Sequence, residues 1–159
     1  MTGALRLAVL LGLVSACGPS LRGSADPTRV ARLHRVVVLP FAIPEGAPRS
    51  LSDGFADEIT SDLAGAGFAV VDREAVDETG TDAVLIGRVV TYRDQSVSPE
   101  LDTSLAVSVQ IVDVRTREVV LSTSSNATAA GTFCSQEMTC LRGKVLAAMG
   151  RFIVRGGSN

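Results

Sequence analysis

Three cysteines and a single histidine are the residues of this chain most suited to covalent or acid–base chemistry. Cys17 is the most informative of them, because it directly follows a leader-like segment. Residues 1–16 contain one basic side chain, Arg6, then an apolar run, and they close on the small residues Ser15 and Ala16. The apolar run lies within the ~7–15 residues of a secretory signal and is well short of the ~20 needed to span a bilayer. We therefore predict that residues 1–16 are a signal peptide and that the mature chain begins at Cys17.

The segment Val14-Ser15-Ala16-Cys17 resembles the lipobox of bacterial lipoproteins. The resemblance implies cleavage before Cys17, a diacylglycerol on its sulfur and an acyl chain such as palmitate on its new amine. Two or more acyl chains give stable membrane anchoring. Gly18 stands where an Asp would resemble an inner-membrane retention signal, so we expect attachment to the outer membrane on the periplasmic face, with exposure at the cell surface as the alternative. An ordinary signal peptide followed by a chance cysteine is the other interpretation of the leader.

The charge of the mature chain argues against some partners. The whole chain has 15 basic and 17 acidic residues, and loss of Arg6 with the signal leaves a net charge of about −3. No basic stripe is present that could displace counterions from phosphates, so no nucleic acid is expected as a partner. The sequence also lacks a polybasic run for anionic lipid, and membrane contact is expected to come from the N-terminal lipid alone.

Cys134 and Cys140 remain as an even pair once Cys17 is assigned to lipid. In an oxidising envelope compartment such a pair favours a disulfide, and closing the short loop would stabilise the fold by ~2–3 kcal/mol in the chain-entropy model. Two free or buried thiols are the alternative, since a bridge needs close and well-aimed Cβ atoms. A zinc site is not predicted, because two cysteines at this spacing and a distant His34 match no zinc pattern.

The remaining residues do not predict an enzyme. The chain has no Gly-x-Ser-x-Gly, Walker glycine loop or His-Glu-x-x-His, and we expect no catalytic residue, no cofactor and no metal. His34 flanks a predicted strand and is interpreted as a partly exposed flank residue rather than a catalytic one. Four acidic residues could imitate a carboxylate site, but a solvated helix face explains them better. They are Asp53, Asp57, Glu58 and Asp62.

Composition divides the mature chain into three parts. Residues 18–32 are rich in Gly, Pro and Ser and have no apolar period, so with Cys17 they are interpreted as a lipidated, flexible tether over residues 17–32. Residues 33–155 are predicted to form a single domain, and residues 156–159 a tail. The domain is long enough to bury a core of its own.

Two amphipathic helices are predicted in the domain. For the first, Ser50 is the expected N-cap, with Asp53 in the capping-box position and Gly65 or Gly67 ending the helix. Its apolar face is Leu51, Phe55, Ile59 and Leu63. For the last helix the apolar face is Met138, Leu141, Val145, Met149 and Phe152, which leaves Arg142, Arg151 and Arg155 outside.

Short apolar or alternating runs predict the strands. They lie at 36–39, which reads as a central strand buried on both faces, and at 68–71, 83–92, 105–111 and 118–121. The last two are joined as a hairpin at 115–117, and the stretches 75–81 and 122–131 are expected to be polar connections. The predicted fold class is α/β (α+β-like), a mixed central sheet of about five strands in the order β-α-β-β-β-β-α, with two main helices packed on it.

Four segments in this order carry a family resemblance. They are Arg35–Phe41 (RVVVLPF), Gly67–Glu74 (GFAVVDRE), Thr81–Val89 (TDAVLIGRV) and Val107–Thr116 (VSVQIVDVRT). Together they resemble the curli-secretion lipoprotein superfamily over about residues 35–125. That superfamily also holds flagellar outer-membrane accessory lipoproteins, lipoprotein activators of penicillin-binding proteins and the amino-terminal domain of the Tol-system propeller protein.

The chain departs from the family pattern at two places. Arg117 occupies the hairpin turn where the family usually has Gly, so a positive φ there would cost about 1 kcal/mol unless the turn is of another type. The helix expected before the Thr81–Val89 segment is shortened to residues 75–81. That shortening removes surface which longer relatives use for assembly.

The resemblance implies a non-enzymatic accessory or assembly factor for an envelope machine, such as a cell-wall synthase, flagellar or secretion complex. The alternative is a ring-forming subunit of a curli-type secretion channel, in which case the chain would be a homo-oligomer. A pore needs additional hairpins of about ten residues per strand, and the chain has no spare segment for them. A small envelope enzyme is a third and weaker reading.

Overall fold

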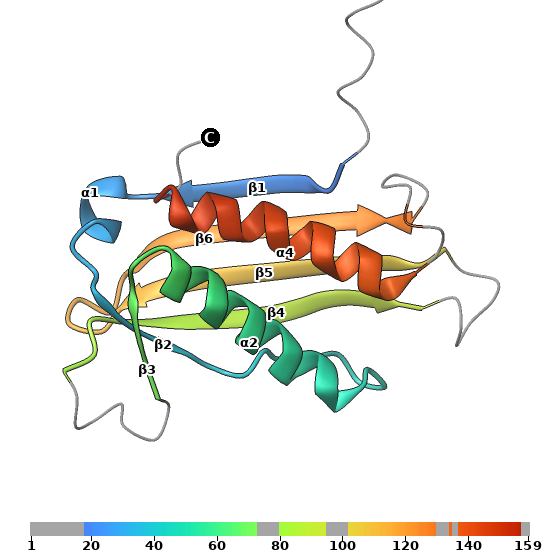
Figure 1. Cartoon of the computed structure of the whole chain (residues 1–159), viewed down its shortest axis with the longest axis horizontal. Coiled ribbons are helices and arrows are strands. Elements are labelled where there is room, and N and C mark those ends of the chain that lie inside the picture. The colour runs from blue at the N-terminus through green and yellow to red at the C-terminus, as the bar shows by residue number, and fades with distance from the viewer. Residues whose placement is uncertain (1–17, 73–79, 95–101, 130–133, 135–136, 157–159) are drawn as a thin grey trace, which may run out of the picture.

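The structure is a computed structural model, and it describes residues 18–72, 80–94, 102–129, 134 and 137–156. Cys17 and most of the predicted connection at 75–81 lie outside the described residues. In chain order the elements are β1 (Ser20–Ala25), α1 (Pro27–Val30), β2 (Arg35–Val38), α2 (Arg49–Gly65), β3 (Ala69–Val71), β4 (Ala83–Arg93), β5 (Ser104–Asp113), β6 (Val119–Thr128) and α4 (Met138–Val154) (Figure 1).

One mixed sheet organises the molecule. Its six strands lie in the order β1-β6-β5-β4-β2-β3. β2 pairs in parallel with β3 and β4, whereas the pairs β4–β5, β5–β6 and β6–β1 are antiparallel. The two long helices, α2 and α4, lie side by side on the same face of this sheet (Figure 1). The predicted mixed sheet with two main helices is confirmed, with one strand more than expected.

The additional strand is β1, and it corrects the prediction that residues 17–32 form a flexible tether. The strand pairs with β6 at six consecutive positions. Sequence reasoning missed it because its Ser, Gly and Arg residues show no apolar alternation. Gly23 helps the strand to pack, since a Cβ at this position would lie 2.5 Å from the ring of Phe152 in α4. The domain therefore begins at Ser20 rather than at residue 33.

The apolar faces predicted for the two helices bury as expected. Buried residues include Leu51, Phe55, Ile59 and Leu63 in α2, and Leu141, Val145, Met149 and Phe152 in α4. Met138, predicted on the same face of α4, is only half-buried. The predicted capping box is wrong, because α2 already begins at Arg49, after an extended Pro48 that offers no side-chain cap. Ser50 and Asp53 therefore lie inside the helix. Gly67 has φ +93° and supplies the left-handed residue that follows the helix, as predicted.

Phe41, which lies between β2 and α2, packs where β4 has no side chain. Its ring is 2% exposed and stacks on Phe55 of α2, with the ring centroids 5.5 Å apart. The same ring occupies the space that a Cβ at Gly87 of β4 would need. One packing contact therefore explains two positions of the family-like segments. They are Phe41, which ends the first segment, and Gly87, which lies within the third.

The predicted hairpin of β5 and β6 is present. Arg117 in its turn has φ 59°, the conformation that favours Gly. The Asp113 carboxylate accepts the backbone N–H groups of Arg115 at 2.8 Å and Thr116 at 3.0 Å, which supports the turn. These hydrogen bonds, first that from Thr116, lower the pKa of Asp113.

β6 continues well past the predicted strand 118–121. Thr123, Ser125 and Ala127 alternate with exposed residues and are buried on the face that α4 covers. The polar connection predicted for 122–131 is therefore wrong for its first seven residues, which belong to β6. Small hydroxyl residues hid the strand in the sequence, yet their size suits a helix packed closely on the sheet.

Candidate interaction surfaces

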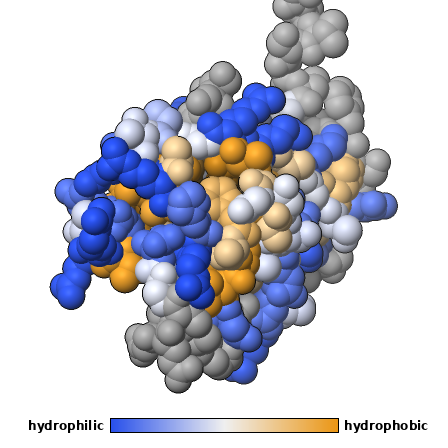
Figure 2. All heavy atoms as spheres, turned by 60° about the vertical axis from the view of Figure 1, so that its left-hand side comes forward, coloured by the Kyte–Doolittle hydropathy of each residue, from blue (hydrophilic) through white to orange (hydrophobic). Residues whose placement is uncertain are grey.

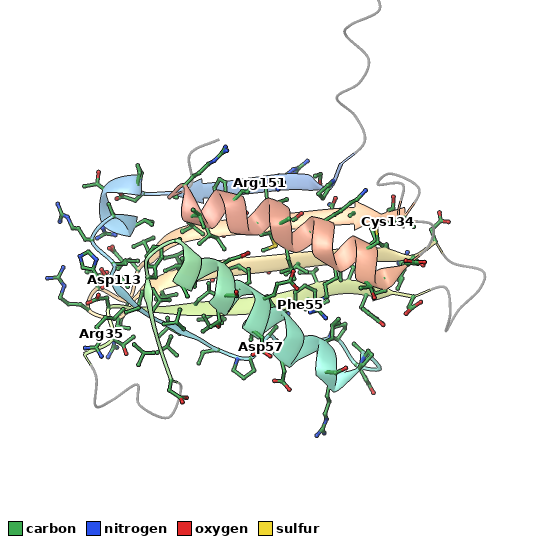
Figure 3. All side chains as sticks on the ribbon, in the orientation of Figure 1. Arg35, Phe55, Asp57, Asp113, Cys134 and Arg151 are labelled. Atoms are coloured by element: carbon green, nitrogen blue, oxygen red, sulfur yellow. A yellow bond between two sulfur atoms is a disulfide. The ribbon has the colours of Figure 1, made fainter. Side chains whose placement is uncertain are left out.

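The carboxylates predicted on one helix face are divided between two sides of α2. Asp53 and Asp57 are exposed, and Figure 3 shows Asp57 at the side of α2 remote from α4. Glu58 instead faces α4, where its Oε2 lies 3.2 Å from Nη2 of Arg142. Asp62 also faces α4, because its carboxylate occupies the space of a Cβ at Gly150. The four acids therefore do not converge on one site.

Arg142 ties the two helices together and was assigned to the exposed side by sequence reasoning. Besides Glu58, its Nη2 donates to the carbonyl oxygen of Gly54 at 3.3 Å, and the guanidinium lies 5.7 Å from the centre of the Phe55 ring. A Cβ at Gly54 would collide with this guanidinium. Gly54 and Glu58 lie one helical turn apart on α2, so both reach the same guanidinium.

His34 is exposed, and its backbone rather than its ring makes the notable contact. The Asp82 carboxylate accepts the backbone N–H groups of His34 and Arg35, both at 2.9 Å. These two hydrogen bonds, with that from His34 the stronger cause, lower the pKa of Asp82. Asp82 thus holds the start of β2 against the start of β4. Sequence reasoning did not assign this structural role, although Asp82 lies within one of the family-like segments.

A hollow of about 340 Å³, partly apolar in its lining and called the apolar hollow below, lies at the end of the domain where α1, the start of β3 and the end of α4 meet. Buried Val30 and Leu33 line it, together with Phe68 and with Val154, which is 47% exposed. Figure 2 shows apolar surface at this end of the molecule, flanked by charged side chains. The hollow has the character of a contact surface for an apolar side chain.

A second, polar hollow of about 550 Å³ adjoins it and includes Arg29, Arg32 and Arg115. Arg29 lies 2.5 Å from Glu118 and so joins α1 to the β5–β6 turn. The hydrogen bond that Arg29 donates to this carboxylate raises the pKa of Arg29. Asp82 and Asp113 also line the hollow, but both are engaged by backbone N–H groups. The hollow presents arginines rather than an acid–base pair.

A third hollow, the β1–α4 groove, runs between the edge strand and the last helix and has a volume of about 390 Å³. It is lined by Gly18, Pro19, Leu21, Ala148, Arg151, Phe152 and Arg155. Arg151 stands at the rim beside β1 (Figure 3). Arg151 and Arg155 are exposed, and no acid pairs with either of them in the part of the chain that the structure describes.

No described helix covers the opposite face of the sheet. Ile86 and Val90 of β4 project from it and are 45% and 57% exposed. On β1, β5 and β6 the same face is mostly small and polar, because Ser and Asn side chains alternate with buried residues there. It forms a flat surface with a limited apolar part.

Cys134 and Cys140 form a disulfide, with their Cα atoms 5.5 Å apart. The bridge ties Cys134, four positions before α4 begins, to Cys140 in the first turn of that helix. Cys134 is labelled in Figure 3 and is 2% exposed. Neither sulfur is therefore available as a nucleophile. Among the described residues, no group of three or more His, Cys, Asp or Glu residues is arranged to hold a metal ion. No described helix is long and apolar enough to cross a membrane.

No family model matches the chain, and no curated protein matches it. Solved structures do share its fold. The PelC dodecamer from Paraburkholderia phytofirmans matches with a TM-score of 0.67 at 16% identity, covering 89% of this chain and 99% of that chain. Lipoprotein GNA1162 from Neisseria meningitidis matches with a TM-score of 0.52 at 19% identity, covering 76% of this chain and 97% of that chain. The chain thus has the same fold as these two proteins, and the wider superfamily stays a resemblance.

Proposed function

We propose that this chain is an outer-membrane lipoprotein, anchored through Cys17 and facing the periplasm, that serves without catalysis as an accessory or assembly factor of an envelope complex. A cell-wall synthase, flagellar or secretion complex is the machine we expect it to join. The observation that carries the proposal is the match of nearly the whole domain to PelC and to lipoprotein GNA1162. Such a domain acts through its surfaces, and the apolar hollow at Val154 is one that offers apolar side chains to a partner.

Lipidation is tested by processing. Cys17→Ala is expected to accumulate as unprocessed, unanchored precursor, whereas the wild-type protein should carry acyl chains at its N-terminus by mass spectrometry. Cys140→Ser is the matched control, since it removes a cysteine of the disulfide and should leave processing unchanged. Normal processing and membrane association of Cys17→Ala would contradict the anchor.

The partner and its docking surface are tested together by photo-crosslinking in intact cells. A photoreactive amino acid is placed at Val154 in the apolar hollow, at Ile86 on the uncovered sheet face, or at Asp57 on α2. Capture of a synthase, flagellar or secretion component from one position and not from the others supports the accessory function and locates the surface. Failure of all three positions to capture such a component, with normal levels of anchored protein, would reject it.

A ring-forming subunit is the second candidate, and the observation that favours it is that PelC was solved as a dodecamer. In this chain the β5–β6 hairpin is committed to the sheet, so a ring would stand on the membrane rather than cross it with these strands. The mass of the detergent-solubilised protein distinguishes the candidates. A discrete multimer, with crosslinks to its own copies, favours the ring, and a monomer favours the accessory factor.

A further inference from the structure

The segment that links the predicted lipidation site to the folded domain is very short. Gly18 and Pro19 alone separate Cys17 from Ser20, where β1 begins. The three Cα–Cα steps from Cys17 to Ser20 span at most about 11 Å. An acylated Cys17 therefore holds the start of the edge strand within that distance of the membrane surface.

The β1–α4 groove is the surface beside this attachment point, because Gly18 and Pro19 form part of its wall. Arg151 lies in the last turn of α4 and Arg155 is the C-cap four positions later, so the two side chains line the same groove. Both are exposed, and apolar side chains from the two elements, Leu21 of β1 and Phe152 of α4, line the groove with them. Basic side chains around an apolar floor are the pattern of a surface that lies on lipid headgroups.

Charge is divided unequally between the two sides of the molecule. Neither β1, β6 nor α4 contains an acidic residue, whereas together they carry Arg22, Arg142, Lys144 and Arg151, with Arg155 directly after α4. Of the acids that directly flank these elements, Asp26 and Glu118 both contact Arg29, and Glu137 precedes α4 at the other end of that helix from Arg155. α2 has four acidic residues and one arginine. The basic side is therefore the one next to the anchor, and exposed Asp57 lies on the other side (Figure 3).

We propose that the β1–α4 groove and its edge strand lie against the membrane, where Arg22, Arg151 and Arg155 contact the phosphates of anionic phospholipids. This inference rests on the lipidation of Cys17 proposed above. Arg22 is exposed on the opposite face of β1, so the edge strand is flanked by basic side chains on both faces. A folded partner in this position would have to enter a gap limited by the short link to the lipid, and anionic headgroups are already there.

The sequence indicates only part of this surface, since the pattern of the last helix places Arg151 and Arg155 outside. Arg22 and the pair Arg151 and Arg155 lie at opposite ends of the chain, and they come together only because β1 joins the sheet beside α4. Each basic side chain near an anionic leaflet raises the population of the bound orientation about fivefold, and the effect weakens with salt. Reversal of two charges should lower that population by at least about 25-fold.

Tryptophan fluorescence can report the orientation, because the chain has no tryptophan of its own. Ala147→Trp places the fluorophore on an exposed position of α4 one turn before Arg151, and Ala64→Trp places it on an exposed position of α2. Each lipidated protein is reconstituted into vesicles that contain brominated phosphatidylcholine, with or without phosphatidylglycerol. Mass spectrometry of the purified protein first establishes that Cys17 is acylated.

The expected result is quenching of the Ala147→Trp protein but not of the Ala64→Trp protein, in the presence of phosphatidylglycerol. Quenching should fall when phosphatidylglycerol is omitted, when salt is raised or when Arg151→Glu and Arg155→Glu are added. The matched control, Arg35→Glu with Arg115→Glu, changes the net charge equally at the far end of the sheet and should keep the quenching.

Three outcomes would overturn the inference. Equal quenching of both tryptophans means that the domain has no fixed orientation. Quenching that does not change when phosphatidylglycerol is omitted or the two arginines are replaced means that headgroup charge does not determine the orientation. Protection of the Ala147→Trp fluorophore from aqueous acrylamide without quenching by brominated lipid means that a second copy covers the edge. In each case an acylated Cys17 leaves the proposed lipoprotein function standing, whereas an unmodified Cys17 rejects both.

Discussion

Replacing Gly87 by Ala tests whether the packing of Phe41 on bare β4 backbone is needed for stability. The added Cβ would enter the space of the Phe41 ring, which is 2% exposed and is held against Phe55 at a centroid distance of 5.5 Å. Overpacking of this kind costs ~1–3 kcal/mol, and loss of glycine from a strand returns ~0.5–1 kcal/mol. We expect a net loss of about 1–2 kcal/mol in the free energy of unfolding, or a fall in Tm of about 3–8 °C.

Urea unfolding of the mature protein measures this loss, and the chain offers a matched control. A Cβ at Gly143 in α4 would have no neighbour within 4 Å. Gly143→Ala should therefore raise stability, by up to about 1 kcal/mol, through helix propensity. Combining Gly87→Ala with Phe41→Leu should cost less than the sum of the two single changes, since the smaller side chain relieves the clash. A Gly87→Ala protein as stable as the wild type would refute the packing argument.

Three further changes probe contacts elsewhere. Replacing Cys134 and Cys140 together by Ser should lower the free energy of unfolding by about 2–3 kcal/mol, as the loop-entropy model gives for so short a loop, and a wild type reduced with dithiothreitol should lose the same amount in urea. Asp82→Asn should cost about 1 kcal/mol at neutral pH. Because the folded-state pKa of Asp82 is lowered, the contribution of Asp82 to the free energy of unfolding is complete above the unfolded-state pKa. This contribution disappears as the pH falls through the folded-state pKa. The difference in stability between variant and wild type, measured in urea, should therefore vanish in acid. A double-mutant cycle of Glu58→Gln with Arg142→Gln should give a coupling of about 0.2–1 kcal/mol that weakens in high salt, since both side chains are about one-third exposed; a coupling unaffected by salt would contradict an ion pair.

Sequence patterns predicted the fold wherever apolar residues express the period of an element. The four-residue steps from Leu51 to Leu63 gave the buried face of α2, and the alternation from Leu105 to Ile111 gave β5. The prediction failed for strands that are held by backbone hydrogen bonds and composed of small residues. β1 and the second half of β6 consist mostly of small and polar residues, so neither has an apolar alternation that predicts a strand.

The side-chain contacts between elements were harder to predict, because they join residues that are distant in the chain. Arg142 was assigned to the exposed side, and the fold instead places it against Glu58, 84 positions earlier. In the sequence Asp82 is only one position of a strand motif. The structure shows that its carboxylate accepts the backbone N–H groups at the start of β2. The disulfide was accessible to sequence reasoning because its partners are only six positions apart and no other pair remained.

The short link before β1 restricts how far the domain can move from the membrane, and this restriction can be tested. A domain held through Cys17 can move from the membrane by about 11 Å before β1 is pulled from β6, beginning at the Ser20–Asn126 pair. Inserting about ten Gly and Ser residues between Pro19 and Ser20 adds about 17 Å of average reach without touching the paired strand. The Tm should therefore stay at the wild-type value, whereas quenching of the Ala147→Trp reporter by brominated lipid should fall severalfold. Unchanged quenching would mean that the arginines alone hold the edge to the membrane, and a lowered Tm would mean that the link itself supports the fold.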